Sequence, residues 1–165
     1  MTAARPAGKS RLALWALLGL ALCGGFLAPW PAHAAGDPAV VDSRSGLAIS
    51  GFDPVAYFTD GAAKIGRADM ELSQGGTVWR FRNEGNRSAF AGHPEVYTPR
   101  FGGYDPVAIA RGTSVPGHPL IWAVAGERLY FFYNDAARAA FIADPGRIIE
   151  AATRKWPEVE RTIGR

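Results

Sequence analysis

Sulfur chemistry is nearly absent from this sequence. Its 165 residues include a single cysteine, Cys23, and this residue directly follows an apolar N-terminal run that has the features of an export signal. The mature protein is therefore expected to contain no thiol. That excludes disulfide bonds, cysteine metal sites and thiol catalysis. Histidine is also scarce, because only His93 and His118 follow the predicted signal.

The export signal is predicted from the first 34 residues. Three basic residues precede an apolar run at 12–22, and the segment ends in Ala32-His33-Ala34, the small-x-small pattern of a signal peptidase site. We expect cleavage between Ala34 and Ala35 after export by the general (Sec-type) route. The product is then periplasmic or secreted.

A membrane anchor is not expected after cleavage, because no second long apolar run follows the signal. A lipid anchor on Cys23 is not expected either. Leu22 stands immediately before it, where lipoprotein signals require a small residue.

The mature chain also has no excess of positive or negative charge. The signal holds three of the 18 Lys and Arg residues and none of the 15 Asp and Glu residues, which leaves 15 of each. The sequence pI of about 9.3 therefore reflects the signal. Nothing in this balance favours a nucleic acid partner. The remaining segment, 35–165, is long enough for a single domain.

The most informative motif occurs twice. Gly-aromatic-Asp-Pro-Val-Ala stands at 51–56 and again at 103–108, 52 positions later. Asp followed by Pro favours a helix start, because the carboxylate accepts first-turn N–H groups and Pro needs no acceptor there. The motif therefore predicts two structural helix starts. It leaves open whether one of these turns also carries the chemistry.

The same order of elements follows each motif. We predict β-hairpins over 70–81 and 121–132, each with a glycine-containing turn. A helix capped by Asn83 follows the first hairpin, and one capped by Asn134 or Asp135 follows the second. A short strand at 47–49 is expected before the first motif.

An internal duplication is inferred from the spacing of these features. At an offset of 51, four residues of the first helical region coincide with four of the second: Asn83, Arg87, Phe90 and Pro94 with Asn134, Arg138, Phe141 and Pro145. We place the units at about 47–98 and 99–148. A lone hairpin is rarely stable, so the two units should pack together.

The predicted fold class is therefore α+β. It comprises two pseudo-repeats of Asp-Pro turn, antiparallel β-hairpin and helix, packed as one small domain. Ile148, Ile149, Ala152 and Trp156 recur at helical spacing and predict an additional C-terminal helix over 147–156, ending at Pro157.

These motifs resemble the YHS domain family, and the resemblance covers nearly the whole mature chain. Tyr130-Phe131-Phe132 before a capped helix is similar to the family in general. The exported branch is similar to four further segments: 49–58, 79–81, 94–97 and 101–104. The chain departs from the family pattern because it lacks the Tyr-His-Ser tripeptide and the usual cysteine or selenocysteine.

The resemblance implies thiolate chemistry that this chain lacks. Cysteines of the metal-handling branch would fall at Ala56 or Ala108, at Arg82 or Tyr133, and at Asn86 or Ala137. In the exported branch the cysteine or selenocysteine would fall at Asp105. An aspartate at a helix start keeps the negative charge and the capping bonds, but it performs no redox chemistry and binds soft metals poorly.

The candidate ligand or metal residues are Asp53, Asp105, His93 and His118. A metal site would require the histidines to meet the carboxylates in space. The two aspartates could pair if the two turns face each other. Helix capping would equally explain both aspartates, and solvated loops would explain both histidines.

Aromatic residues supply the second set of candidates, although most are expected in the core. On a strand, Phe131 and Tyr133 should point away from Tyr130 and Phe132. One face of the second hairpin is then either covered by the C-terminal helix or lines a ligand pocket. The pocket candidates are Tyr104, Trp122, Phe131 and Tyr133. A basic cluster, Arg80, Arg82, Arg87 and Arg100, is expected to be a solvated face or a carboxylate-binding rim.

An enzyme is not expected, because no nucleophile–base constellation or phosphate-binding loop is recognisable. The expected function is an exported, non-enzymatic YHS-like module. It would bind a small ligand or a hard metal ion near the Asp-Pro turns, with its cofactor unidentified. The alternative is a degenerate protein-interaction module with no ligand site.

Overall fold

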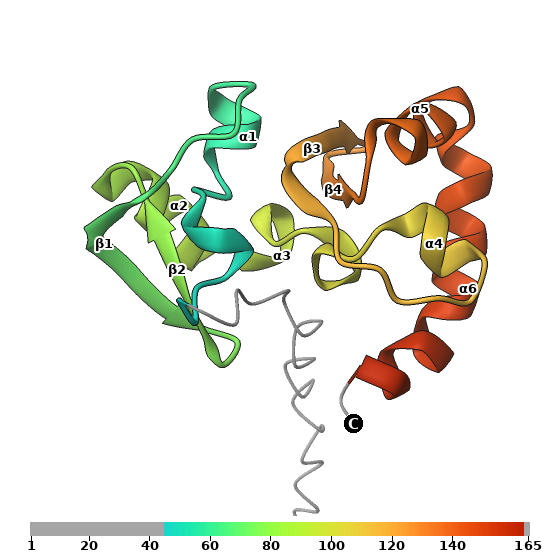
Figure 1. The fold of residues 1–165 in the computed structure, drawn as a ribbon. Coiled ribbons are helices and arrows are strands. Elements are labelled where there is room, and N and C mark those ends of the chain that lie inside the picture. Colours follow the sequence, from blue (N-terminus) through green and yellow to red (C-terminus); the bar gives the residue numbers. More distant parts are fainter. Residues whose placement is uncertain (1–44, 164–165) are drawn as a thin grey trace, which may run out of the picture. The chain divides into compact units, whose positions relative to one another are not determined.

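The computed structural model describes residues 45–163 (Figure 1). The predicted export signal and its cleavage site, Ala34 and Ala35, lie outside this range. All described residues belong to one compact unit. They form a mixed α+β fold with two small antiparallel hairpins, several helices and a long C-terminal helix, as the sequence predicted.

The first half of the described chain runs from a tight turn through a hairpin to two short helices. Its elements are η1 (Ile49–Gly51), α1 (Ala56–Thr59), β1 (Arg67–Gln74), β2 (Thr77–Phe81), α2 (Glu84–Gly92) and α3 (Pro94–Tyr97). The strand predicted at 47–49 is wrong. Leu47 makes only an isolated bridge to Val78, because the backbone of Ile49 and Ser50 turns left-handed and ends any extended segment.

The second half has the same kinds of element in the same order. They are η2 (Arg100–Gly103), α4 (Pro106–Ala110), β3 (His118–Ala125), β4 (Arg128–Phe132), α5 (Asp135–Ala143) and α6 (Pro145–Ile163). Asn83 caps α2 by accepting from the N–H of Asn86, and Asn134 caps α5 by accepting from the N–H of Ala137. Both predicted helix starts are confirmed, with Asn134 rather than Asp135 as the second cap.

Both hairpins close with a two-residue loop whose residues have positive φ. Gly75 and Gly76 form the first loop, and Gly126 and Glu127 form the second. Loops of this kind match the right-handed twist of the flanking strands, which explains why both hairpins form here. Each hairpin also carries a register shift, between Arg67 and Glu71 in β1 and between His118 and Trp122 in β3.

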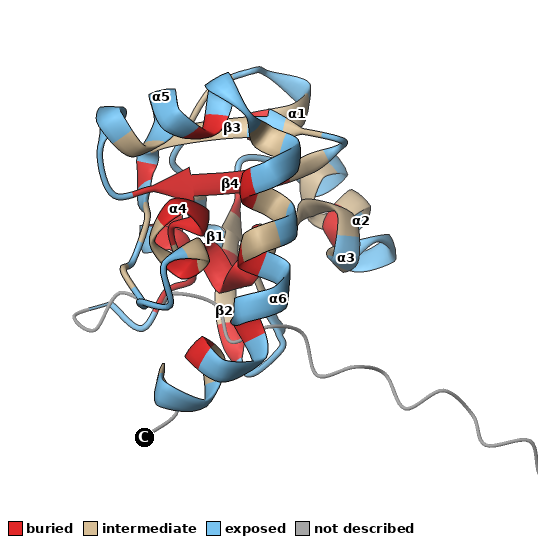
Figure 2. Cartoon of the chain, turned by 90° about the vertical axis from the view of Figure 1, so that its right-hand side faces the viewer, coloured by how far each residue is buried: buried red, intermediate tan, exposed pale blue. Residues whose placement is uncertain are grey.

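The two hairpins differ in how they are buried (Figure 2). Strand β2 alternates, so its buried side chains all lie on one face. Strand β4 is buried on both faces, since Leu129 and Phe131 pack with the core of the first half while Tyr130 and Phe132 pack against Phe141 of α5. A continuous apolar run is what two-sided burial of a strand requires. The core of the second half, to which α5 and α6 both contribute, therefore covers one face of β4, and the core of the first half covers the other.

Tyr57 links the two halves. Its hydroxyl donates to the carbonyl of Pro119 at 2.9 Å, and its ring lies edge-on to Trp122 with the centroids 5.1 Å apart. Burial, and to a smaller extent the charge of Asp53, raise the pKa of Tyr57 well above its ordinary value. The neutral hydroxyl is therefore the form that the fold stabilises.

The C-terminal helix is longer than the sequence predicted. We expected it to end at Pro157, but α6 continues through Pro157 to Ile163. The proline removes one backbone hydrogen bond, at a cost of about 3 kcal/mol in a helix interior. Val159, which is 2% exposed, and Ile163 extend the apolar stripe of Ile148, Ala152 and Trp156 by another turn. Burial of these two side chains offsets the cost.

Candidate ligand-binding site

Each Asp-Pro turn begins with three consecutive left-handed residues. Phe101, Gly102 and Gly103 have φ values of 55°, 60° and 88°, and 49–51 adopt the same conformation before Asp53. For a buried aromatic residue such as Phe101 this conformation is strained, by about 1–3 kcal/mol. The surrounding core maintains it and thereby directs the following aspartate inward.

Asp105 is 2% exposed and accepts from three backbone N–H groups. Its Oδ1 accepts from the N–H groups of Val107 at 2.8 Å and Ala108 at 3.4 Å, which caps α4. Its Oδ2 accepts from the N–H of Tyr133 at 3.0 Å, just beyond the end of β4. The side chain therefore joins the start of α4 to the end of the second hairpin.

Asp53 occupies the corresponding place in the first half and is completely buried. Its Oδ1 accepts from Val55 and Ala56, while its Oδ2 accepts from the N–H of Arg82 at 2.8 Å and from Nδ2 of Asn86 at 2.7 Å. The extra side-chain donor distinguishes this turn from the turn at Asp105.

Two glycines that the sequence analysis did not single out hold these turns in place. Gly66 donates its N–H to the carbonyl of Gly51, and Gly117 donates to that of Gly103. A Cβ at Gly66 would lie 2.5 Å from the backbone of Arg80, and one at Gly117 would lie 2.7 Å from the carbonyl oxygen of Gly103. Only glycine allows such close approach. Their spacing of 51 was the sequence signal that could have identified them.

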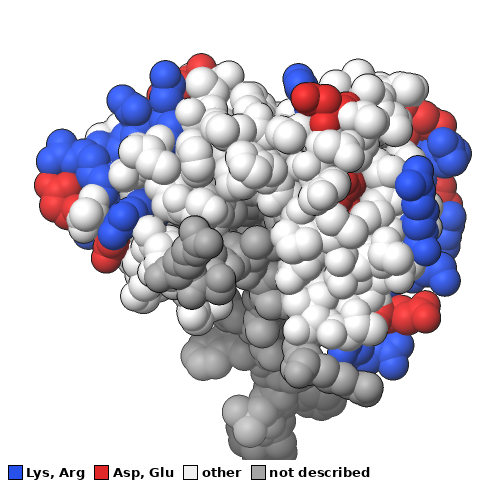
Figure 3. All heavy atoms as spheres, in the orientation of Figure 1, with Lys and Arg blue, Asp and Glu red and all other residues white. Residues whose placement is uncertain are grey.

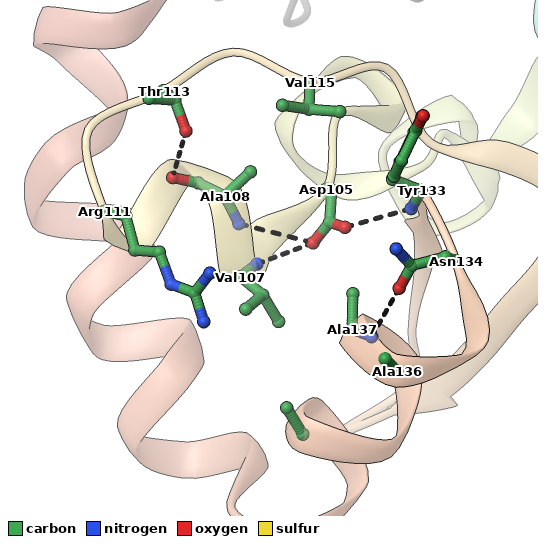
Figure 4. Close-up of a pocket in the computed structure, with 11 residues that line it drawn as sticks. Asp105, Val107, Ala108, Arg111, Thr113, Val115, Tyr133, Asn134, Ala136 and Ala137 are labelled. Atoms are coloured by element: carbon green, nitrogen blue, oxygen red, sulfur yellow. Dashed lines mark hydrogen bonds between the residues drawn. The ribbon is translucent and has the colours of Figure 1, made fainter.

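A pocket of about 350 Å³ opens beside Asp105 (Figure 4). It lies between α4 with the loop that follows it and the first turns of α5. Its apolar lining consists of small side chains, namely Val107, Ala108, Val115, Ala136, Ala137 and Ala140. This volume is at the lower end of the range for small-molecule sites, roughly 300–1,000 Å³.

Polar groups of the pocket lie at its floor and rim. The Asp105 carboxylate is in the floor, and Arg111, Thr113 and Asn134 stand around it (Figure 4). The Thr113 hydroxyl already donates to the carbonyl of Ala108 at 3.0 Å. Arg111 is exposed, and its guanidinium makes no hydrogen bond or ion pair with another described residue, although its backbone N–H donates to the carbonyl of Ala108. Its guanidinium is therefore available to an acceptor on a ligand.

The pocket is lined by apolar side chains together with a few hydrogen-bonding groups. Its lining contains no histidine, cysteine or lysine. Asp105 is held by three backbone N–H groups, and the Thr113 proton is committed to a carbonyl. No group in this lining is arranged as a nucleophile with an adjacent base.

The structure separates the four predicted ligand or metal residues. Of Asp53, Asp105, His93 and His118, only Asp105 lines the pocket. Nδ1 of His93 lies 3.6 Å from Oε1 of Glu95, and the His93 side chain is largely exposed. His118 is exposed, and its Nδ1 accepts from the N–H of Leu120. Within residues 45–163, no three His, Cys, Asp or Glu side chains are grouped so that they could hold a metal ion.

The four aromatic pocket candidates are separated as well. Only Tyr133 lines the pocket, where its side chain is 63% exposed at the rim. Tyr104 packs against Trp156 under α6, and its partial burial raises the pKa of its hydroxyl. Phe131 is a core residue, and Trp122 packs beside it against Tyr57.

The predicted basic cluster is largely neutralised by neighbouring acids. Arg80 pairs with Glu71 and Arg87 pairs with Glu84, each at 2.8 Å. Arg100 instead lies over the ring of Phe101, 5.3 Å from its centroid. Figure 3 shows Lys and Arg interspersed with Asp and Glu at the margins of the visible face. This distribution is typical of a solvated surface.

None of the described helices is both long enough and apolar enough to cross a membrane. In comparisons with protein-family models, with curated proteins and with solved structures, nothing matches this chain.

Proposed function

We propose that this protein is an exported, non-enzymatic binding module of the YHS type. Its binding site is the pocket at the second Asp-Pro turn, and its ligand is a small molecule. The observation that carries this proposal is the position of the pocket. Ala108, Tyr133 and Ala137, where the resemblance places cysteines of the metal-handling branch, all line it together with Asp105.

The proposal includes an internal duplication, supported by paired contacts in the two halves. Asp53 donates its N–H to the carbonyl of Lys64, and Asp105 donates its N–H to that of Val115. The left-handed turns, the two close glycines and the register shifts are paired in the same way. Two diverged copies of one unit account for all these pairs, and the pocket beside Asp105 lies in the second copy.

Ligand binding can be tested with protein purified under native conditions from the exporting cell. We expect a small molecule to be released on denaturation and identified by mass spectrometry. Ala140→Leu should narrow the pocket and abolish this ligand. Ala139→Leu lies on the same helix but outside the pocket, and it should retain the ligand. Absence of any ligand, or equal retention by both variants, would contradict the proposal.

The sequence also allowed a metal ion as the ligand. Elemental analysis of the same preparation for copper, zinc, iron and calcium tests whether one of these metals is bound. If all four are absent and adding them leaves the melting temperature unchanged, the ligand is not one of these metals.

Export is tested separately. We expect the N-terminus of the mature protein to be Ala35. Ala34→Glu should leave the precursor uncleaved, because the signal peptidase requires a small residue before the cut. A mature protein beginning at Met1 would contradict export by cleavage.

A degenerate protein-interaction module remains the second candidate. It is favoured by apolar side chains exposed along β3, where Leu120 is 59% and Val124 is 40% exposed. A double Leu120→Ser and Val124→Ser variant should lose partner capture from periplasmic extract if this surface acts. It should leave the small molecule bound if the pocket is the functional site.

A further inference from the structure

The two aspartates differ in one carboxylate oxygen. Oδ2 of Asp53 accepts from a backbone N–H and from the carboxamide of Asn86, whereas Oδ2 of Asp105 accepts only the N–H of Tyr133 among the described residues. A carboxylate oxygen has room for two donors. The oxygen beside the pocket therefore has one acceptor position to spare.

The missing donor can be traced to one helix position. Asn86 and Ala137 each donate a backbone N–H at 2.8 Å to the asparagine that caps their helix, three residues earlier. They hold equivalent positions in α2 and α5. Only the side chain differs, because Ala137 has no carboxamide. Ala137 lines the pocket, so the space that Asn86 fills in the first half is open in the second (Figure 4).

We propose that the pocket binds its ligand through a primary amide or ammonium group that donates to Oδ2 of Asp105. This group takes the place of the Asn86 carboxamide at the first turn. The inference rests on the proposed function, since it specifies the chemistry of the ligand in that pocket. An ionised carboxylate can only accept, so the group facing Asp105 must carry an N–H. A carboxylate in the same place is repelled.

The polar side chains at the rim of the pocket indicate which chemical group the other end of the ligand carries. Arg111 offers a guanidinium with no described partner. Asn134 uses its Oδ1 to cap α5, which leaves its Nδ2 as a further donor at the pocket. Both groups are donors, and a carboxylate is the acceptor that suits a guanidinium best. The ligand class is therefore a short molecule with an N–H donor at one end and a carboxylate at the other.

Three probes separate these requirements in an NMR titration of the purified protein. Succinamate carries both groups, succinate lacks the N–H donor, and acetamide lacks the carboxylate. We expect succinamate to shift the backbone amides of Val107, Tyr133 and Ala137 and to bind at least about tenfold more tightly than succinate. Tenfold is the smallest effect expected for one hydrogen bond to a charged group. Acetamide should shift the same amides more weakly.

Ala137→Asn provides the matched variant. Its carboxamide should donate to Asp105 as that of Asn86 does to Asp53, filling the pocket and abolishing the succinamate shifts. Ala139→Asn places the same residue on an exposed part of α5 outside the pocket and should bind as the unmodified protein does. The reciprocal change, Asn86→Ala, should free one acceptor position on Oδ2 of Asp53, and acetamide should raise the melting temperature of this variant more than that of the unmodified protein.

The outcomes separate this inference from the proposed function. Equal binding of succinate and succinamate overturns the inference, as does undiminished binding by Ala137→Asn. The comparison of the two probes needs no variant, so it decides even if Ala137→Asn does not fold. If compounds without an N–H donor shift the pocket amides and succinamate does not, the inference falls and the proposed function stands. If no compound shifts them and no ligand accompanies the native protein, both fall.

Discussion

The turn at Asp53 is closed, whereas the turn at Asp105 has space beside it. Both aspartates follow a turn of three left-handed residues, accept N–H groups at the beginning of the next helical segment and join it to the end of a hairpin. The first carboxylate also receives the Asn86 carboxamide, and the second borders a pocket at Ala137. The comparison teaches that the two turns differ chiefly at one helix position, which is Asn86 beside the first carboxylate and Ala137 beside the pocket.

The largest expected difference is in the cost of removing each aspartate. Asp53→Ala leaves four donors without their acceptor, three of them backbone N–H groups, and should lower the free energy of unfolding by roughly 3–5 kcal/mol. Asp105→Ala leaves three, beside a pocket that admits water, and should cost roughly 2–3 kcal/mol. Urea unfolding of both variants measures the difference. A greater loss of unfolding free energy for Asp105→Ala than for Asp53→Ala would contradict this prediction.

The two close glycines test whether the turns share one architecture. Gly66→Ala and Gly117→Ala each place a Cβ 2.5 Å from a neighbouring atom, and each should destabilise the protein by about 3 kcal/mol, the upper part of the range for overpacking. Gly92→Ala is the control, because a Cβ there meets no atom within 4 Å. A tolerated substitution at only one of the two sites would show that the turns are held differently.

Asn86→Ala should make the first turn resemble the second. It removes one hydrogen bond to a carboxylate, and the better helix propensity of alanine returns part of the loss, so the net cost should be about 1–2 kcal/mol. Thermal unfolding should be measured for this variant and for Asn86→Asp, and the losses of stability compared. A second carboxylate facing Asp53 should be worse than alanine, and the opposite ranking would mean that Asn86 does not act as a donor.

The smallest expected effect is at the link between the halves. Tyr57→Phe removes the hydrogen bond to Pro119 and should cost about 0.5–1.5 kcal/mol at neutral pH. Since the fold raises the pKa of Tyr57 above 10.0, its stabilisation is complete below pH 10 and is lost as the pH rises further. The variant should therefore lose less stability than the unmodified protein as the pH rises from 10 to 12. If the stability of the two proteins changes identically with alkaline pH, the neutral Tyr57 hydroxyl does not stabilise the fold.

The repeated local signals in the sequence were sufficient to predict most elements. Asp-Pro, the hairpin glycines and the capping asparagines act within a few residues, so both hairpins and the helices they precede were found. Pro157 misled the prediction of α6, because the burial of Val159 depends on distant residues. The pocket could not be predicted either. It arises from Ala137, whose significance appears only when its position is compared with that of Asn86 in three dimensions.

Strand β4 affects the order in which the protein can fold during synthesis. Leu129 and Phe131 complete the core around Trp79, Phe81 and Phe90, although these residues are encoded about fifty positions earlier. A nascent chain released from the ribosome only as far as α3 cannot bury that core. Folding of the first half must wait until about 132 of the 165 residues have emerged. Such a delay is what the proposed Sec-type export would require, because that pathway transports unfolded chains.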